Sequence, residues 1–216
     1  MIRTRSLAYA YPGGAPLRFD DLDVAQGAAL LLLGPSGAGK STWLALAAGL
    51  LTATGGTIEV AGQDLAALRG PARDAWRGRA IGFLPQKLHL SEALDVEDNL
   101  ALSFFAAGLP RNAGAIAAVL SSLGVGELAR RRPSQLSGGQ AQRVALARSV
   151  LLAPRVILAD EPTASLDDDA CAASVALLRD AAGRCGATLV IATHDRRVRE
   201  ALADAVVHRL QARVAA

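Results

Sequence analysis

The sequence has no apolar run long enough to cross a membrane, and this absence sets the first limit on its role. About half of its 216 residues are hydrophobic (51%), but its apolar runs fall short of the roughly 18 to 20 residues that a membrane-spanning helix needs. The chain also begins with a strand-like stretch rather than with the apolar core of a signal peptide. We therefore expect a cytoplasmic protein that reaches a membrane only through another subunit.

Cysteine and lysine are scarce. The two cysteines, Cys171 and Cys185, have no partner motif around them, so we interpret them as small hydrophobic side chains in a reducing compartment. Among the 23 basic residues only Lys40 and Lys87 are lysine, and the formal net charge is a modest +3. We interpret the run 130–132, three arginines, as a solvated helix end rather than a phosphate track. We expect no nucleic-acid partner.

What the sequence does contain is an alternation of short apolar runs with helical patterns, which is typical of a parallel sheet with crossover helices. We predict a strand-rich stretch over 2–33 and strands over Thr57–Val60, Ala80–Leu84, Val156–Ala159, Thr188–Ala192 and Val206–Arg209. We predict helices over Lys40–Ala48, Leu94–Ala107, Asn112–Leu123, Gly139–Leu152 and Asp168–Ala182. Within the first stretch, Ala29–Leu33 is apolar throughout, as expected for a strand covered on both faces. The fold class is α/β.

The middle of the chain differs from the rest. Residues 87–132 contain two helical patterns separated by Gly108-Leu109-Pro110, with no strong strand between them. The strand–helix alternation returns after Pro133. We therefore predict one domain over 1–216, with a core formed by 1–86 and 133–216 and a helical subdomain over 87–132.

A phosphate-binding loop is the strongest local signal. The pattern GxxxxGK[ST] is matched in full, between a predicted strand and a predicted helix. The residues are Gly34, Pro35, Ser36, Gly37, Ala38, Gly39, Lys40 and Ser41, followed by Thr42. Glycines let successive N–H groups point at phosphate oxygens, and the helix N-terminus favours an anion. Lys40 is predicted to reach the β- and γ-phosphates of ATP and Ser41 to ligate Mg²⁺. The alternative, a glycine-rich turn without a ligand, does not explain the full match in this context.

Two adjacent carboxylates follow the apolar strand over 156–159. Because successive side chains of a strand point to opposite faces, Asp160 and Glu161 cannot have the same role. We predict that Asp160 holds Mg²⁺, in part through water, and that Glu161 polarises the attacking water as general base. The alternative is a helix N-cap pair, since Pro162-Thr163 comes next.

The pentapeptide Leu136-Ser137-Gly138-Gly139-Gln140 stands between these two motifs. Ser137 could be a helix N-cap and the glycines a turn. As it stands, however, the pentapeptide is the signature of the ABC (ATP-binding cassette) ATPases, and the whole chain resembles that family. The resemblance implies a P-loop NTPase (RecA-like) parallel-sheet core, an N-terminal antiparallel β region and a helical insertion.

Four further sites follow from the resemblance. Tyr11 matches the adenine-stacking aromatic, with Tyr9 as its competitor. Gln86 matches the glutamine that approaches Mg²⁺ and links the site to the helical insertion. Asp167, within Ser165-Leu166-Asp167, matches the D-loop, and His194 matches the switch histidine.

The resemblance also implies partners. Two like subunits would enclose two ATP, with Ser137, Gly138, Gly139 and Gln140 of one copy facing the phosphate loop of the other. A membrane permease would dock near Gln86 to Leu109, where Leu88, Leu90 and Leu94 are candidate contacts, and would hold the protein on the inner face of the membrane. The motifs resemble those of the lipoprotein-release, macrolide-export and cell-division subgroup, which implies export, release or mechanotransmission. A small-molecule importer ATPase and a soluble non-transport ABC ATPase remain alternatives.

Overall fold

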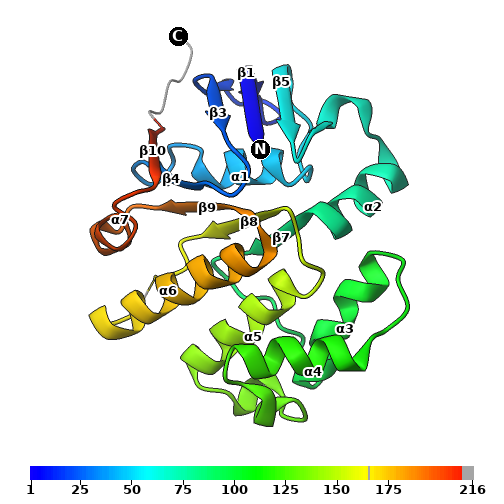
Figure 1. Ribbon diagram of the computed structural model, residues 1–216. Helices are drawn as coiled ribbons and strands as arrows, with labels where there is room; N and C mark the ends of the chain where they lie inside the picture. The colour runs from blue at the N-terminus through cyan, green and yellow to red at the C-terminus, as the bar shows by residue number, and fades with distance from the viewer. Residues whose placement is uncertain (165, 211–216) are drawn as a thin grey trace.

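The computed structural model describes residues 1–164 and 166–210, and one of its two five-stranded sheets is parallel. The strand order is β10-β4-β9-β8-β7, and Figure 1 shows helices on both faces of this sheet. The strands are β4 (Ala29–Leu33), β7 (Ile81–Leu84), β8 (Val156–Asp160), β9 (Thr188–Thr193) and β10 (Val206–Arg209). Each was predicted to within one residue. Because the strands are parallel, their carboxyl ends share one edge, and the predicted site residues follow those ends.

The apolar strand β4 is buried because it is packed on both faces. Leu30 and Leu32 belong to the cluster around helix α1 (Lys40–Ala47), whereas Leu31 and Leu33 belong to the cluster around α5 (Gly138–Val150) and α6 (Asp168–Cys185). Strand β9 is likewise buried along its whole length. The burial of β4 confirms the prediction that this strand is covered on both faces.

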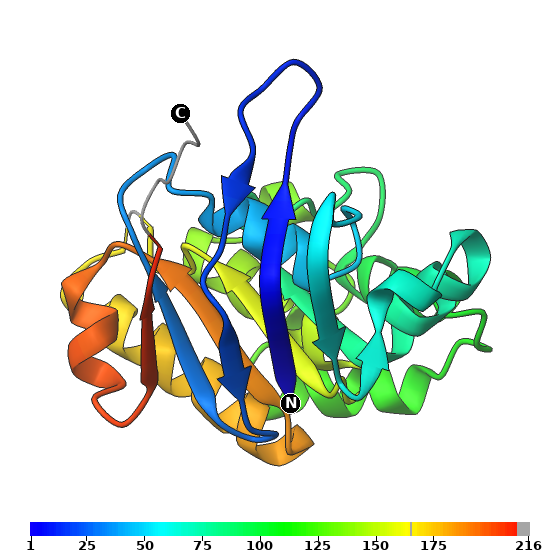
Figure 2. The same ribbon diagram turned by 90° about the horizontal axis from the view of Figure 1, so that it is seen from above.

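The second sheet, which is antiparallel, lies on the other side of α1. Its strands are β1 (Ile2–Tyr9), β2 (Leu17–Arg18), β3 (Leu22–Val24), β5 (Gly55–Val60) and β6 (Gln63–Asp64), and β1 pairs with β2, β3 and β5. Figure 2 looks down on this sheet and shows it stacked above the parallel one. The predicted antiparallel β region is therefore confirmed, and α1 is held between the two sheets.

The predicted helices in the middle of the chain are α3 (Val96–Ala106) and α4 (Ala113–Ser122). Their buried side chains, such as Leu100 and Ile116, share one apolar cluster with Val144 of α5. The division into a core and a helical subdomain at residues 87 and 132 stays a prediction. Within the ranges that the structure describes, no helix is long and apolar enough to span a bilayer. Both cysteines are free thiols, Cys171 buried and Cys185 partly buried.

Two helices were not predicted. Helix α2 (Gly70–Ala80) lacks an apolar stripe, and it is held instead by Trp76, which packs on the interior, and by Arg73, which donates hydrogen bonds to the carbonyls of Leu65 and Leu68. Helix α7 (Arg196–Ala201) has six residues, too few for a periodic pattern to show. Short 3₁₀ helices at Leu65–Ala67, Gly126–Leu128 and Pro133–Gln135 complete the connections.

The glycine at position 82 fixes how closely α5 approaches β7. A Cβ atom there would lie 2.1 Å from the Ser149 carbonyl oxygen, so Gly82→Ala must push the backbone of α5 away from the strand. We expect the free energy of unfolding to fall by about 1–3 kcal/mol or more, as for other overpacked sites, in urea denaturation. Gly183→Ala on α6 is the control. A Cβ there meets nothing within 4 Å, and alanine in a helix should stabilise by up to about 1 kcal/mol. Equal stability of the two variants would contradict the packing argument.

Candidate functional site

The phosphate loop connects β4 to α1 at the carboxyl edge of the parallel sheet. Gly37 and Gly39 have φ values of 81° and 90°, a left-handed conformation that glycine adopts without steric cost. The Lys40 ammonium is almost fully buried and donates hydrogen bonds to the Gly34 and Pro35 carbonyls at 2.8 and 3.3 Å. The loop therefore encloses its own lysine, beside the N–H groups that begin α1.

Asp160 ends strand β8 beneath this loop. Its Oδ1 atom is buried and has no hydrogen-bond partner among the described residues. Burial raises the pKa of the Asp160 carboxyl, and a hydrogen bond with Ser41 acts in the opposite direction. A buried carboxylate oxygen without a partner is costly, and beside a serine hydroxyl it offers two oxygens that a divalent cation would satisfy. The predicted metal residues Asp160 and Ser41 thus fit a cation.

Glu161 follows the strand in a strained conformation, with φ at +46°, which costs about 1–3 kcal/mol for a residue other than glycine. Its N–H donates to the Ala192 carbonyl at 2.8 Å. Its carboxylate accepts a hydrogen bond from the Thr193 hydroxyl at 2.9 Å and lies 2.8 Å from His194 Nδ1 and 3.5 Å from Lys40 Nζ. No helix starts here, because α6 begins at 168, so the N-cap alternative is wrong.

Tyr11, and not Tyr9, lines the cleft above the loop. The Tyr11 hydroxyl lies 3.0 Å from the Thr42 hydroxyl, and its half-exposed ring meets the Tyr9 ring edge to face with centroids 4.8 Å apart. Tyr9 itself packs against the interior. The cleft has a volume of about 370 Å³ and is lined by Tyr11, Leu17, Ser36, Gly37, Gly39, Lys40, Ser41, Thr42, Gln86, Asp160, Glu161 and His194.

The signature residues lie elsewhere on the chain. Ser137 caps α5: its hydroxyl accepts from the Gln140 N–H at 3.2 Å, and the Gln140 side chain accepts from the Ser137 N–H at 2.9 Å. Ser137 is therefore the N-cap of α5, as one interpretation of the sequence predicted. A Cβ at Gly138 or Gly139 would meet nothing within 4 Å, so this face is uncovered, and none of the four residues lines the cleft.

The D-loop residue Asp167 is also outside the cleft. It is exposed and caps α6, its carboxylate accepting from the Ala170 N–H at 2.8 Å. Ser165, which belongs to the same predicted motif, lies outside the described residues. Within one chain, the fold thus brings together the phosphate loop, Tyr11, Gln86, Asp160, Glu161 and His194, but not the signature or Asp167.

Comparison with known proteins agrees with this arrangement. The family model described as "ABC transporter" matches residues 17–164. The chain is 44% identical over 199 residues to the lipoprotein-releasing system ATP-binding protein LolD of Anaeromyxobacter dehalogenans, covering 91% of this chain and 83% of that protein. The chain belongs to the ABC transporter family. It is an ATP-binding and ATP-hydrolysing subunit of such a transporter.

One further relative and one solved structure are similar to this ABC ATPase. The methionine import ATP-binding protein MetN of Myxococcus xanthus is 40% identical and covers 95% of this chain and 64% of that protein. The solved dimeric structure of a post-hydrolysis state of the ATP-binding cassette MJ0796, bound to ADP and Pi, superposes with a TM-score of 0.83 at 28% identity, covering 98% of this chain and 94% of that one.

One residue of the ABC site was missed by the sequence analysis. Thr193 ends β9 and donates to the Glu161 carboxylate, although it lies 32 residues away. The sequence feature that could have identified Thr193 is its position directly before the predicted switch histidine, on the strand that neighbours β8. Strand pairing makes the contact, since Asp160 stands opposite Ala192 in the β8–β9 register.

Proposed function

We propose that Glu161 is the general base of ATP hydrolysis and that the ATP is held between two copies of this subunit. The observation that carries the proposal is the strained, nearly buried Glu161 carboxylate, held by Thr193 and His194 beside Lys40. Thr193 and His194 orient the carboxylate, which takes the proton of the attacking water. Lys40 and the N–H groups at the start of α1 stabilise the charge on the β- and γ-phosphates. Tyr11 stacks on the adenine.

Mg²⁺ fits the oxygens of Asp160 and Ser41, with Gln86 at the rim of the cleft. This ion commonly binds through one or two protein carboxylates together with phosphate oxygens and water, so one buried carboxylate is sufficient. When bound, Mg²⁺ would neutralise charge that develops on the β- and γ-phosphates.

The signature acts on the ATP of the other copy in this proposal. Ser137, Gly138 and Gly139 form the uncovered N-terminus of α5, where the helix dipole favours an anion. Their position outside their own chain's cleft supports this arrangement, in which each ATP joins the phosphate loop of one copy to the signature of the other. Loss of the γ-phosphate removes that bridge, so ATP hydrolysis allows the two copies to separate.

The permease is proposed to dock beside α3, which would hold the subunit on the inner face of the membrane. Leu102, Phe105 and Ala106 share one face of α3, and Leu109 continues it; these side chains are exposed, Phe105 by 84%. Ala106 also lines a groove of about 420 Å³ between α2, β7, α3 and α5, together with Arg77 and Arg148. An apolar face next to a groove fits a short helix of a membrane partner. Leu88 and Leu90, in contrast, pack against the interior.

Export, release or mechanotransmission is the proposed mode, on the likeness to LolD. The likeness to MetN favours a second candidate, the ATPase of an importer. These two modes differ in the permease: a four-span partner with a large extracytoplasmic domain indicates the first, and a many-span partner with a solute-binding protein indicates the second.

Tagging the subunit in its native cell, cross-linking it and identifying membrane partners tests this proposal. We expect Phe105→Glu to reduce permease recovery at least about tenfold, because a charge replaces a central apolar contact, without change in the subunit's own ATP turnover. Val206→Glu is the control, since Val206 is also exposed (45%) but stands on the edge strand β10, away from α3. Recovery of soluble partners alone would overturn the transporter proposal, and full recovery with Phe105→Glu would overturn the docking site.

A further inference from the structure

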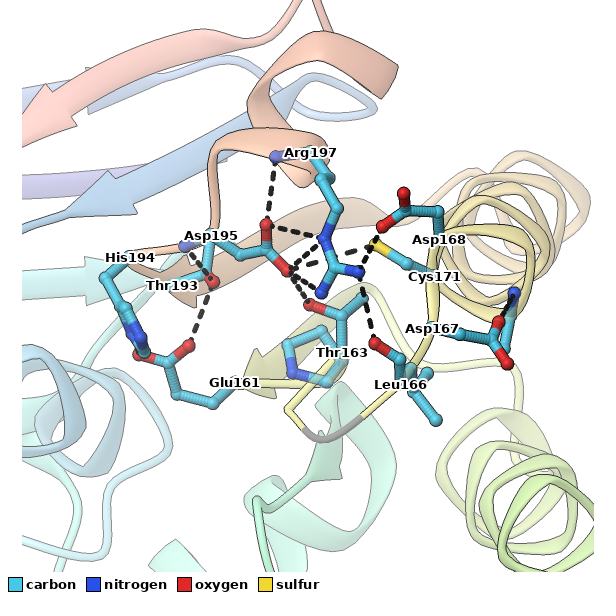
Figure 3. A network of polar contacts seen from close by, with 12 residues as sticks. Glu161, Thr163, Leu166, Asp167, Asp168, Cys171, Thr193, His194, Asp195 and Arg197 are labelled. Atoms are coloured by element: carbon cyan, nitrogen blue, oxygen red, sulfur yellow. Dashed lines mark hydrogen bonds and ion pairs between the residues drawn. The ribbon is translucent and has the colours of Figure 1, made fainter.

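Asp195 and Arg197 form the centre of a polar network behind the cleft (Figure 3). Asp195 Oδ2 accepts a hydrogen bond from the buried Thr163 hydroxyl at 3.1 Å and from Arg197 Nη2 at 2.8 Å. Arg197 Nε lies 3.1 Å from both oxygens of the same carboxylate. This is a multi-point, charge-assisted contact, which fixes orientation as well as adding attraction.

The other side of the guanidinium holds the beginning of α6. Arg197 Nη1 donates to the Leu166 carbonyl at 3.1 Å and to Asp168 Oδ1 at 2.8 Å. These two partners stand directly before and directly after Asp167 in the chain. A planar guanidinium can bond both groups while it also holds Asp195, whereas a lysine ammonium is a point charge without that fork.

The same network reaches the Glu161–His194 pair. The Asp195 N–H donates to the Thr193 hydroxyl at 3.0 Å, and that hydroxyl donates to the Glu161 carboxylate at 2.9 Å. Thr163, which donates to Asp195, follows Glu161 by two residues. Figure 3 shows these contacts as an unbroken path from Glu161 to the start of α6.

On its far side the network faces the signature helix across two hollows. Leu166, whose carbonyl Arg197 holds, lines one apolar hollow together with Gly139 and Gln142 and a second one together with Gly138. Gln142 of α5 also donates hydrogen bonds to the Pro162 carbonyl and, at 2.9 Å, to the Ser174 hydroxyl. Leu166 is thus held by Arg197 through its carbonyl and faces the signature glycines of its own chain across these hollows.

We propose that Asp195 and Arg197 are positioning residues that lock Leu166 and the start of α6 between this copy's Glu161–His194 pair and its signature glycines. The inference rests on the proposed two-copy arrangement, in which those glycines serve the other ATP. Asp195 and Arg197, which we call the clamp, then make ATP-driven dimerisation depend on how Glu161 of the same chain is held. A hydrogen bond with Arg197 is the main cause that lowers the pKa of Asp195 to about 2, so the carboxylate is charged at neutral pH.

The test is ATP-dependent dimerisation by sedimentation in the Glu161→Gln background, where turnover does not disperse the pair. Adding Arg197→Gln should raise the protein concentration needed for half-dimerisation about tenfold, as expected for loss of charge-assisted contacts. Binding of a fluorescent ATP analogue to the monomer should be unchanged, because neither Asp195 nor Arg197 lines the cleft. A merely structural role would move both readouts together.

Two further variants make the result decisive. Arg196→Gln removes the neighbouring arginine, which is exposed and whose side chain has no hydrogen bond or ion pair with a described residue, and should dimerise as the background does. Asp168→Asn removes the negative charge of one partner of Arg197 but keeps an oxygen that can accept its hydrogen bond, at a side chain that is 90% exposed. Folding is therefore safe, and dimerisation should weaken less than with Arg197→Gln. If Arg197→Gln dimerised as well as the Glu161→Gln background, the proposed role of the clamp would be wrong, but the two-copy proposal would stand. Failure of the Glu161→Gln background itself to dimerise would overturn the two-copy proposal and the clamp with it.

Discussion

Glu161→Gln is expected to reduce ATP turnover by about 10²–10⁴-fold, the usual contribution of a positioned general base, while an ATP-bound dimer accumulates. The substitution keeps the shape of the side chain and an oxygen that can accept the Thr193 hydrogen bond, but an amide does not take a proton from water. Binding of ATP depends on the phosphate loop, which is unchanged. The γ-phosphate therefore stays in place, and so does the bridge that it forms.

Phosphate release and sedimentation with ATP measure the two halves of this expectation. Glu127→Gln is a suitable control, because Glu127 is an exposed carboxylate on a 3₁₀ helix and does not line the cleft. Turnover close to that of the wild type in Glu161→Gln would remove Glu161 from the role of base. If turnover were lost but no dimer accumulated, the result would support Glu161 as general base and contradict the proposed dimerisation around ATP.

Ser137→Arg is expected to abolish ATP-dependent dimerisation while the monomer still binds nucleotide. The N-terminus of α5 is uncovered, with open space next to Gly138 and Gly139, and a long side chain would fill the space that the other copy's ATP must enter. Turnover should then fall to that of the isolated monomer. Nucleotide binding should persist because Ser137 does not line its own chain's cleft.

The substitution also removes a helix cap, so Ser137→Ala is needed beside it. Loss of the cap alone costs about 0.5–2 kcal/mol of stability, and both variants share that loss, but alanine leaves the surface open. We expect Ser137→Ala to dimerise with ATP in the same sedimentation assay. If Ser137→Arg also dimerised, the signature would not act across the interface.

The local patterns were sufficient for much of this fold. The apolar runs of β4, β8 and β9 predicted strands, and that of β4 predicted a strand covered on both faces; all three are buried along most or all of their length. The phosphate loop was placed to the residue, since a strand, a glycine-rich loop and a helix N-terminus are contiguous in sequence. Helix α2 could not be predicted in this way, because the packing of its single large apolar anchor, Trp76, and the hydrogen bonds of Arg73 to the Leu65 and Leu68 carbonyls depend on residues outside the helix.

By itself, then, the sequence determined the motifs, their order and the family, because each motif is a short run whose chemistry depends on adjacent residues. The tertiary structure decided which of them meet. Pairing of β8 with β9 sets the strained Glu161 against Thr193 and His194. The folded chain also places Tyr11 rather than Tyr9 in the cleft and lets Arg197 hold Leu166 and Asp168 from 31 and 29 residues away. Periodicity and spacing carry no information about such contacts, which exist only when distant strands pack side by side.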